Sequence, residues 1–390
     1  MLAACLVSLF VLSTAHAAFA DSTLTSVPVG HGPYGVAFDS ASGDIYVTNV
    51  FANTVSLVSG SNNSLLATIP VGVGPQGVAF DSANGNLYVA ESGASAVAVI
   101  PGSSVSGSHD NSVVATVSVG TGAKPYGVAF DSTNGDVYVT DNNASSVSVI
   151  SGSNNSVVAT VSLGTKAGPW GIAFDSANGD VYVADQSSDE VSVISGSSNT
   201  VVGTVSLGAN AGPWGVAFDS ANGDVYVTDL GTSAVSVVSG SSNTLAATVS
   251  LGADTGSRGI AFDSASGDLY VTNYNPSTVS VISGSTNAVL GYVQLTSSAG
   301  PFADAFDSTS ENVYVADYSS NLVWVIPQDI ALSTSGGSTT SSSSSSTSSS
   351  GIPEFPYQPL LTGAFVIAVT FAYLAMRRPA ARRRTPAQHS

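Results

Sequence analysis

Seven polar residues recur at one position of a repeated motif, directly after Tyr-Val-Thr or Tyr-Val-Ala in stretches such as "GDVYVTD". Carboxylate and amide oxygens are the ligands that Ca²⁺ and Mg²⁺ prefer, so converging repeats could build a cation site from them. The alternative, which we favour, is that Asp or Asn ends a strand and accepts hydrogen bonds from the following loop. The residues are Asn49, Glu91, Asp141, Asp185, Asp229, Asn273 and Asp317.

A second position varies in the same way, directly before the "GVAFD", "GIAFD" or, in the last unit, "ADAFD" part of the motif. Five of its seven residues are aromatic, and flat aromatic faces stack on sugar rings or apolar ligands. The alternative is packing, in which these rings fill the centre of the fold and wedge the repeats apart. We favour packing, and keep binding as the functional hypothesis for Tyr34, Gln76, Tyr126, Trp170, Trp214, Arg258 and Phe302.

The sequence contains few of the residue combinations that known catalytic sites use. The stretch "DSANGD" lacks the alternating acidic spacing of a calcium loop, so we interpret it as a hairpin turn. No Ser-His-Asp set, HExxH motif or phosphate loop is present. His31 lies beside the first position of the aromatic set, and His109 lies in an insertion. We therefore predict no enzyme and no cofactor beyond a Ca²⁺ or Mg²⁺ ion. The alternative is an extracytoplasmic metal-dependent lyase or hydrolase.

The spacing of the motif identifies the elements that must position these residues. Its phenylalanine recurs at intervals of 42 to 50 residues, and a period in the forties indicates a repeat architecture. Each unit reads as four short strands rich in Val, Ile, Tyr and Thr, which predicts the blade of a β-propeller. The seven phenylalanines are Phe38, Phe80, Phe130, Phe174, Phe218, Phe262 and Phe306.

The seventh unit ends without a fourth strand, while "STLTSVPVG" (Ser22 to Gly30) resembles the fourth strands of other units. We expect this N-terminal strand to complete the last blade and close the ring. Phe218 and Tyr226 should fill the gaps between blades, and Ser236 should take an outer, partly wet position. Glycine should adopt the left-handed conformation in the first hairpin turn of six units, and the seventh turn should differ at Glu311.

The two ends of the chain carry membrane signals. Residues 1–20 read as a signal peptide, which includes Cys5, the only cysteine. The propeller should span 21–330, followed by a Ser/Thr-rich stalk (331–351), a PEFP-like segment (352–359), a transmembrane helix (360–376) and a basic cytoplasmic tail (377–390). All 26 acidic residues lie between Asp21 and Glu354 with only three basic ones. This charge excludes nucleic acid as a partner.

From "YVTN" (Tyr46 to Asn49) and its copies, the chain from Ser22 to Gln328 resembles the YVTN (WD40/YVTN repeat-like) β-propellers of archaeal surface-layer proteins. "IPEFP" (Ile352 to Pro356) resembles a PEF-type sorting signal. The resemblance implies an all-β, seven-bladed surface protein. We expect it to be a structural or adhesive module that binds a glycan or an extracellular protein and is anchored to the plasma membrane. Asn62, Asn143 and Asn154 lie in glycosylation sequons.

Overall fold

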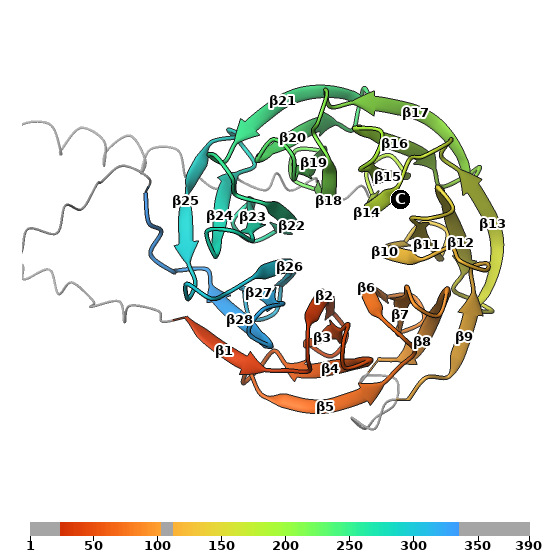
Figure 1. The fold of residues 1–390 in the computed structure, drawn as a ribbon, viewed down its shortest axis with the longest axis horizontal. Coiled ribbons are helices and arrows are strands. Elements are labelled where there is room, and N and C mark those ends of the chain that lie inside the picture. Colours follow the sequence, from red (N-terminus) through yellow and green to blue (C-terminus); the bar gives the residue numbers. More distant parts are fainter. Residues whose placement is uncertain (1–23, 103–111, 335–390) are drawn as a thin grey trace, which may run out of the picture. The chain divides into compact units, whose positions relative to one another are not determined.

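The computed structural model describes residues 24–102 and 112–334. These residues form seven antiparallel sheets of four strands each, arranged around a central axis (Figure 1). Blade one contains β2 (Pro33–Asp39), β3 (Asp44–Asn49), β4 (Thr54–Ser59) and β5 (Leu65–Pro70). Blade two contains β6 (Pro75–Asp81), β7 (Asn86–Glu91), β8 (Ala96–Pro101) and β9 (Ala115–Ser118). Blade three contains β10 (Pro125–Asp131), β11 (Asp136–Asp141), β12 (Ser146–Ser151) and β13 (Ser156–Ser162).

The later blades repeat the same order of strands. Blade four contains β14 (Pro169–Asp175), β15 (Asp180–Asp185), β16 (Glu190–Ser195) and β17 (Thr200–Ser206). Blade five contains β18 (Pro213–Asp219), β19 (Asp224–Asp229), β20 (Ala234–Ser239) and β21 (Thr244–Ser250). Blade six contains β22 (Ser257–Asp263), β23 (Asp268–Asn273), β24 (Thr278–Ser283) and β25 (Val289–Gln294). Blade seven contains β26 (Pro301–Asp307), β27 (Asn312–Asp317) and β28 (Leu322–Pro327).

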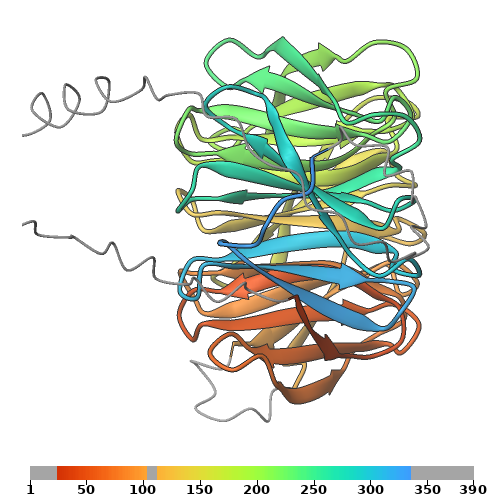
Figure 2. The same ribbon diagram turned by 90° about the vertical axis from the view of Figure 1, so that its left-hand side faces the viewer.

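The N-terminal strand closes the ring, as the sequence predicts. Strand β1 (Thr25–Pro28) pairs antiparallel with β28, with Val27 opposite Val323. The last blade is therefore completed by the first strand of the chain, and the two lie side by side in Figure 1. Val27 is buried, so the closure combines backbone pairing with apolar packing. Figure 2 shows the same ring of blades edge-on.

Glycines bring the innermost strands close together. A Cβ atom on Gly215 would collide with the carbonyl oxygen of Arg258 in the next blade. The Thr228 hydroxyl accepts a hydrogen bond from the Gly215 N–H (2.8 Å) and donates to that same carbonyl (2.6 Å). The threonine of "YVT" thus links two blades, and glycine is required because the backbones meet.

The other end of each first strand carries a second link between blades. The Asp175 carboxylate caps its own hairpin turn by accepting a hydrogen bond from the Ala177 N–H (2.8 Å). Its other oxygen lies so close to Gly240 of the next blade that an added Cβ would be 2.7 Å away. Nearby, the Tyr226 hydroxyl donates to the side chain of Asn287, one blade further on (2.7 Å). The "FDS" and "VYV" parts of the motif therefore hold adjacent blades together.

Two expectations about the strands are wrong. Glu311 does not change the seventh turn, because it adopts φ 58° and donates the same backbone hydrogen bond to Asp307 (2.8 Å) that the glycines make. Ser236 is not outer and wet but fully buried, since each blade is covered on both faces by its neighbours. Phe218 does pack as expected, within an apolar cluster drawn from blades four and five.

Several predicted segments lie outside the described residues. These are the signal peptide, the insertion with His109, most of the stalk, the PEFP-like segment, the transmembrane helix and the basic tail. Within residues 24–102 and 112–334, no helix is long and apolar enough to cross a membrane. The chain divides into two units, residues 1–337 and 338–390, and the described strands all belong to the first.

Candidate functional site: the channel mouth

The seven residues of the second variable position meet at one end of the central channel. They line a cavity of about 280 Å³, which we call the mouth. They meet there because each immediately follows the first residue of an innermost strand, and the seven innermost strands surround the axis. Two further tyrosines complete the lining. The mouth is formed by Tyr34, Gln76, Tyr126, Trp170, Trp214, Arg258, Tyr274, Phe302 and Tyr318.

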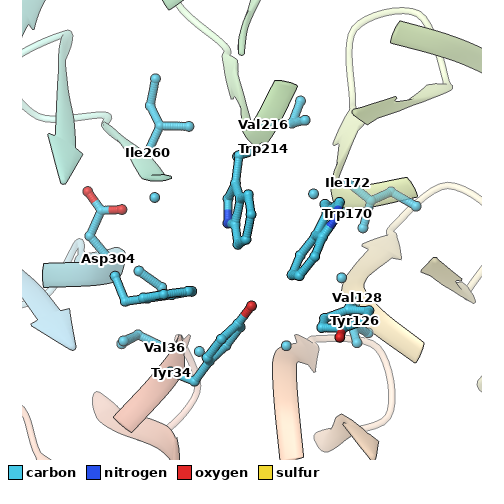
Figure 3. A pocket seen from close by; sticks show the side chains of 18 of the residues that line it. Tyr34, Val36, Tyr126, Val128, Trp170, Ile172, Trp214, Val216, Ile260 and Asp304 are labelled. Carbon is cyan, nitrogen blue, oxygen red and sulfur yellow. The ribbon is translucent and has the colours of Figure 1, made fainter. Parts of the chain in front are cut away.

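The aromatic side chains of the mouth touch one another rather than standing apart. The rings of Trp170 and Trp214 are stacked, with centroids 3.9 Å apart. Tyr126 packs against Trp170 (4.1 Å), and Tyr34 packs against Phe302 (4.2 Å). Figure 3 shows the Tyr34 hydroxyl pointing toward the centre of the mouth. Ring packing between neighbouring blades and a hollow lined by aromatic side chains thus coexist in the same residues.

Tyr274 and Tyr318 are residues of the mouth that the sequence analysis missed. Each directly follows the last residue of a second strand, and this position varies between blades as the mouth position does. Tyr318 contacts Phe302 (5.5 Å) and also Phe51 (5.5 Å), whose ring is 5.1 Å from His31. His31 is exposed and belongs to this aromatic chain. The signal that could have identified the two tyrosines was the variation between blades at the second position after "YVT" or "YVA".

Arg258 is the one cation among the residues that line the mouth. Its guanidinium carbon lies 4.9 Å from the ring centre of Trp214, 4.6 Å from that of Tyr274 and 4.4 Å from that of Phe302. Such contacts stabilise a cation by about 0.5–2 kcal/mol each. Burial lowers the pKa of Arg258, but a guanidinium in a protein stays charged. The mouth thus holds a permanent positive charge within an aromatic box.

The residues that end the second strands lie at the same end of the propeller but inside their own blades. Asp229 is opposite Pro213 in the register, and its carboxylate accepts a hydrogen bond from the Ser236 hydroxyl (2.8 Å). Asp185 and Asp141 accept the same bond from the serine of their own third strands. Glu91 accepts the backbone N–H of Gly72, and Asp317 that of Gly300. Asn49 and Asn273 likewise donate to serines of their own blades.

Burial raises the pKa of three of these carboxyl groups strongly. Desolvation raises the pKa of Asp141 to about 6, against a partly offsetting hydrogen bond from Ser148. It raises the pKa of Asp185 and of Asp229 to about 7 each. Only one oxygen of each carboxylate has a hydrogen-bond partner among the described residues. A charge on any of these three groups is therefore costly at neutral pH.

The predicted cation site has no assembled ligand group in the part of the chain that the structure describes. There, no three Asp, Glu, His or Cys side chains come together in a way that could hold a metal ion. Binding of Ca²⁺ or Mg²⁺ by Glu91, Asp141, Asp185, Asp229 and Asp317 stays an untested prediction. The sequons also stay untested, although Asn62, Asn143 and Asn154 are all exposed in turns.

Below the mouth, the channel continues as a mostly apolar cavity with a volume of about 170 Å³. Six blades present a Val or Ile to it, but blade seven presents Asp304 (Figure 3). Neither Asp304 carboxyl oxygen is accessible or makes a hydrogen bond of ordinary geometry within the described residues. Burial raises its pKa well above the usual range. The aliphatic residues are Val36, Val78, Val128, Ile172, Val216 and Ile260.

Comparison with known proteins supports the propeller and a repeat family. Residues 210–238 match the model of the NHL repeat, and no curated protein matches the chain. A virginiamycin B lyase from Staphylococcus aureus is similar in structure, with a TM-score of 0.67 and 16% identity, over 78% of this chain and 98% of that one. Hydrazine synthase of Kuenenia stuttgartiensis is similar at 0.68 and 16%, over 77% and 96%. At this identity, the likeness shows the fold alone.

Proposed function

We propose that this protein is a membrane-tethered, extracellular β-propeller that acts as a structural or binding module and recognises a glycan or protein partner at the mouth. A β-propeller with an NHL repeat match is consistent with a binding or structural module. The N-terminal apolar segment and the C-terminal apolar run followed by arginines support the extracellular placement. The surface-layer or adhesive role is part of the same proposal.

The observation that carries the proposal is the aromatic lining of the mouth. Tyr34, Tyr126, Trp170 and Trp214 touch one another but are not fully buried, so part of their ring area is left on the cavity side. Partly exposed aromatic rings around a concave surface bind partners at low conformational cost, because each has only two side-chain torsions to fix. Pyranose rings and apolar side chains both fit such faces.

The experiment is a glycan-array screen of the purified full chain, comparing wild type with Trp170→Ala/Trp214→Ala. We expect wild type to bind a restricted set of glycans and the double variant to lose at least tenfold in affinity. Trp324→Phe is the matched control, because Trp324 is buried in blade seven and bonded to Asp317 (3.0 Å). Absence of binding by the wild type would remove the mouth as a glycan site and leave a protein partner to be tested by crosslinking on cells.

An extracytoplasmic enzyme at the mouth is the second candidate from the sequence. Its test is the metal content of the purified chain together with Asp185→Ala and Asp229→Ala. A stoichiometric metal that is lost in these variants would favour the enzyme over the binding module.

A further inference from the structure

We propose that the ligand of the mouth is acidic: a carboxylate-bearing sugar of the uronic acid class, whose carboxylate is bound by Arg258 while aromatic rings cover the sugar face. This inference rests on the proposed function and names the chemistry of the ligand. Three observations support it. Arg258 has no anionic partner among the described residues, charge is distributed unevenly over the propeller, and aromatic rings surround the guanidinium.

The guanidinium of Arg258 has no anionic partner within residues 24–102 and 112–334. The ionisable groups that act on the pKa of Arg258 are Tyr34, Tyr274 and Tyr318, and none of them is a carboxylate. Its Nε is inaccessible and has no hydrogen-bond acceptor in the described structure. Buried charges in proteins are normally paired, because removing them from water is costly. An unpaired guanidinium that lines a cavity therefore points to an anion supplied from outside.

The geometry around Arg258 favours a carboxylate attached to a ring. The guanidinium carbon lies 4.4–4.9 Å from the ring centres of Trp214, Tyr274 and Phe302. A guanidinium presents a fork of N–H donors that matches the two oxygens of a carboxylate. Trp170 and Trp214 line the same cavity and add apolar ring surface beside the guanidinium. A uronic acid combines a flat sugar face with a carboxylate at its edge, which fits both features.

Charge is distributed unevenly between the two ends of the propeller. The three basic residues of the described propeller all lie at the mouth end: Arg258 in the mouth itself, and Lys124 and Lys166 exposed in the loops before β10 and β14. Thirteen acidic residues lie at the opposite end, in the hairpins that join first and second strands. They are Asp39, Asp44, Asp81, Asp131, Asp136, Asp175, Asp180, Asp219, Asp224, Asp263, Asp268, Asp307 and Glu311.

Most acidic side chains at the mouth end are hydrogen-bonded or buried. Asp189 accepts the backbone N–H groups of Asn210 and Gly212 (2.8 Å each), and the strand-end carboxylates are buried in their blades. Glu190 and Asp254 are the other acids of this end, and Asp304 faces the channel below. In a chain of net charge −18, the mouth is thus the place where an anion meets the least repulsion.

The test uses the full chain in a Trp324→Phe background, so that tryptophan fluorescence reports only on Trp170 and Trp214. Two probes share the same sugar rings: trigalacturonic acid and its methyl ester, which is uncharged. We expect the acid to bind at least tenfold more tightly than the ester, with an affinity that falls as salt is raised. Arg258→Gln should remove this preference by weakening the acid at least tenfold and the ester less than twofold.

The Arg258→Lys variant distinguishes a loss of charge from a purely structural effect. It should keep a reduced preference for the acid, because lysine retains the positive charge but lacks the planar fork of donors. Equal binding of the two probes by the wild type, or a preference that survives Arg258→Gln, would overturn the inference and leave the proposed function standing. Binding of neither probe, with binding of neutral glycans on the array, would also overturn it. If no glycan of any kind binds, the proposed glycan function fails as well.

Discussion

Asp229→Asn should stabilise this protein at neutral and alkaline pH. Asp229 is 1% exposed, and within the described part of the chain the one side chain that bonds to its carboxylate is the Ser236 hydroxyl. Two blades carry Asn at the equivalent position, where the Asn273 amide donates to Ser280 (2.8 Å) and the Asn49 amide to Ser56 (3.0 Å). The amide therefore fits this site without rearrangement, and it cannot ionise.

The magnitude follows from the pKa of Asp229. Burial raises it from 3.8 to about 7, and each pKa unit corresponds to about 1.4 kcal/mol. The charged form thus costs up to about 4 kcal/mol, and we expect Asp229→Asn to add about 2–4 kcal/mol to the free energy of unfolding at pH 8.5. The cost is absent below the unfolded pKa, grows as pH rises from 4 to 7, and is constant above that. At pH 4 the variant and wild type should differ by less than about 1 kcal/mol.

The assay is differential scanning calorimetry of the full chain at pH 4 and pH 8.5. Asp254→Asn is the matched control, because Asp254 is exposed and its substitution should change stability by less than about 0.5 kcal/mol at either pH. A variant less stable than wild type at pH 8.5, or a difference that is the same at both pH values, would show that the buried carboxylate is compensated by something that the structure does not contain.

Three further changes test the ring and its channel. Asp304→Val places the aliphatic residue of the other blades in the channel and should raise stability by about 1–3 kcal/mol at neutral pH, measured by thermal denaturation; a lower melting temperature would contradict this. Tyr226→Phe leaves Asn287 without its donor and should cost about 1–3 kcal/mol in urea denaturation; an unchanged midpoint would show that this link between blades is unimportant. Deletion of residues 22–30 removes β1 and exposes the edge of β28, so the melting temperature should fall clearly; equal melting temperatures would refute closure by this strand.

Most of the fold could be predicted because the chain repeats itself. A residue at a fixed place in each of seven repeats must occupy the same place in every blade. Trp214, Tyr34 and Phe302 share one place in the repeat, so all three could be expected at the mouth of the channel. The same symmetry explains why a single cavity collects all seven mouth residues. Closure by Thr25–Pro28 was predictable because its sequence matched the strand missing from the last repeat.

The errors arose where neighbouring blades decide the outcome. Ser236 lies on a strand with both faces covered, so the alternation of wet and dry positions expected for a sheet with one exposed face does not apply. Glu311 keeps the left-handed turn because its surroundings impose it on a residue that disfavours it. Tyr274 belongs to the mouth because its ring reaches Arg258 and also Phe302, which is 28 positions later in the sequence and in the next blade.

By itself, the sequence determined the number of blades, the strand that closes them and the positions that face the axis, because these follow from a period and from the pairing of similar segments. The tertiary structure alone decided the raised pKa of Asp229, the isolation of Arg258 among three rings and the burial of Asp304 below the mouth. These properties depend on desolvation and on partners from other blades, and neither is encoded in the spacing of residues along one strand.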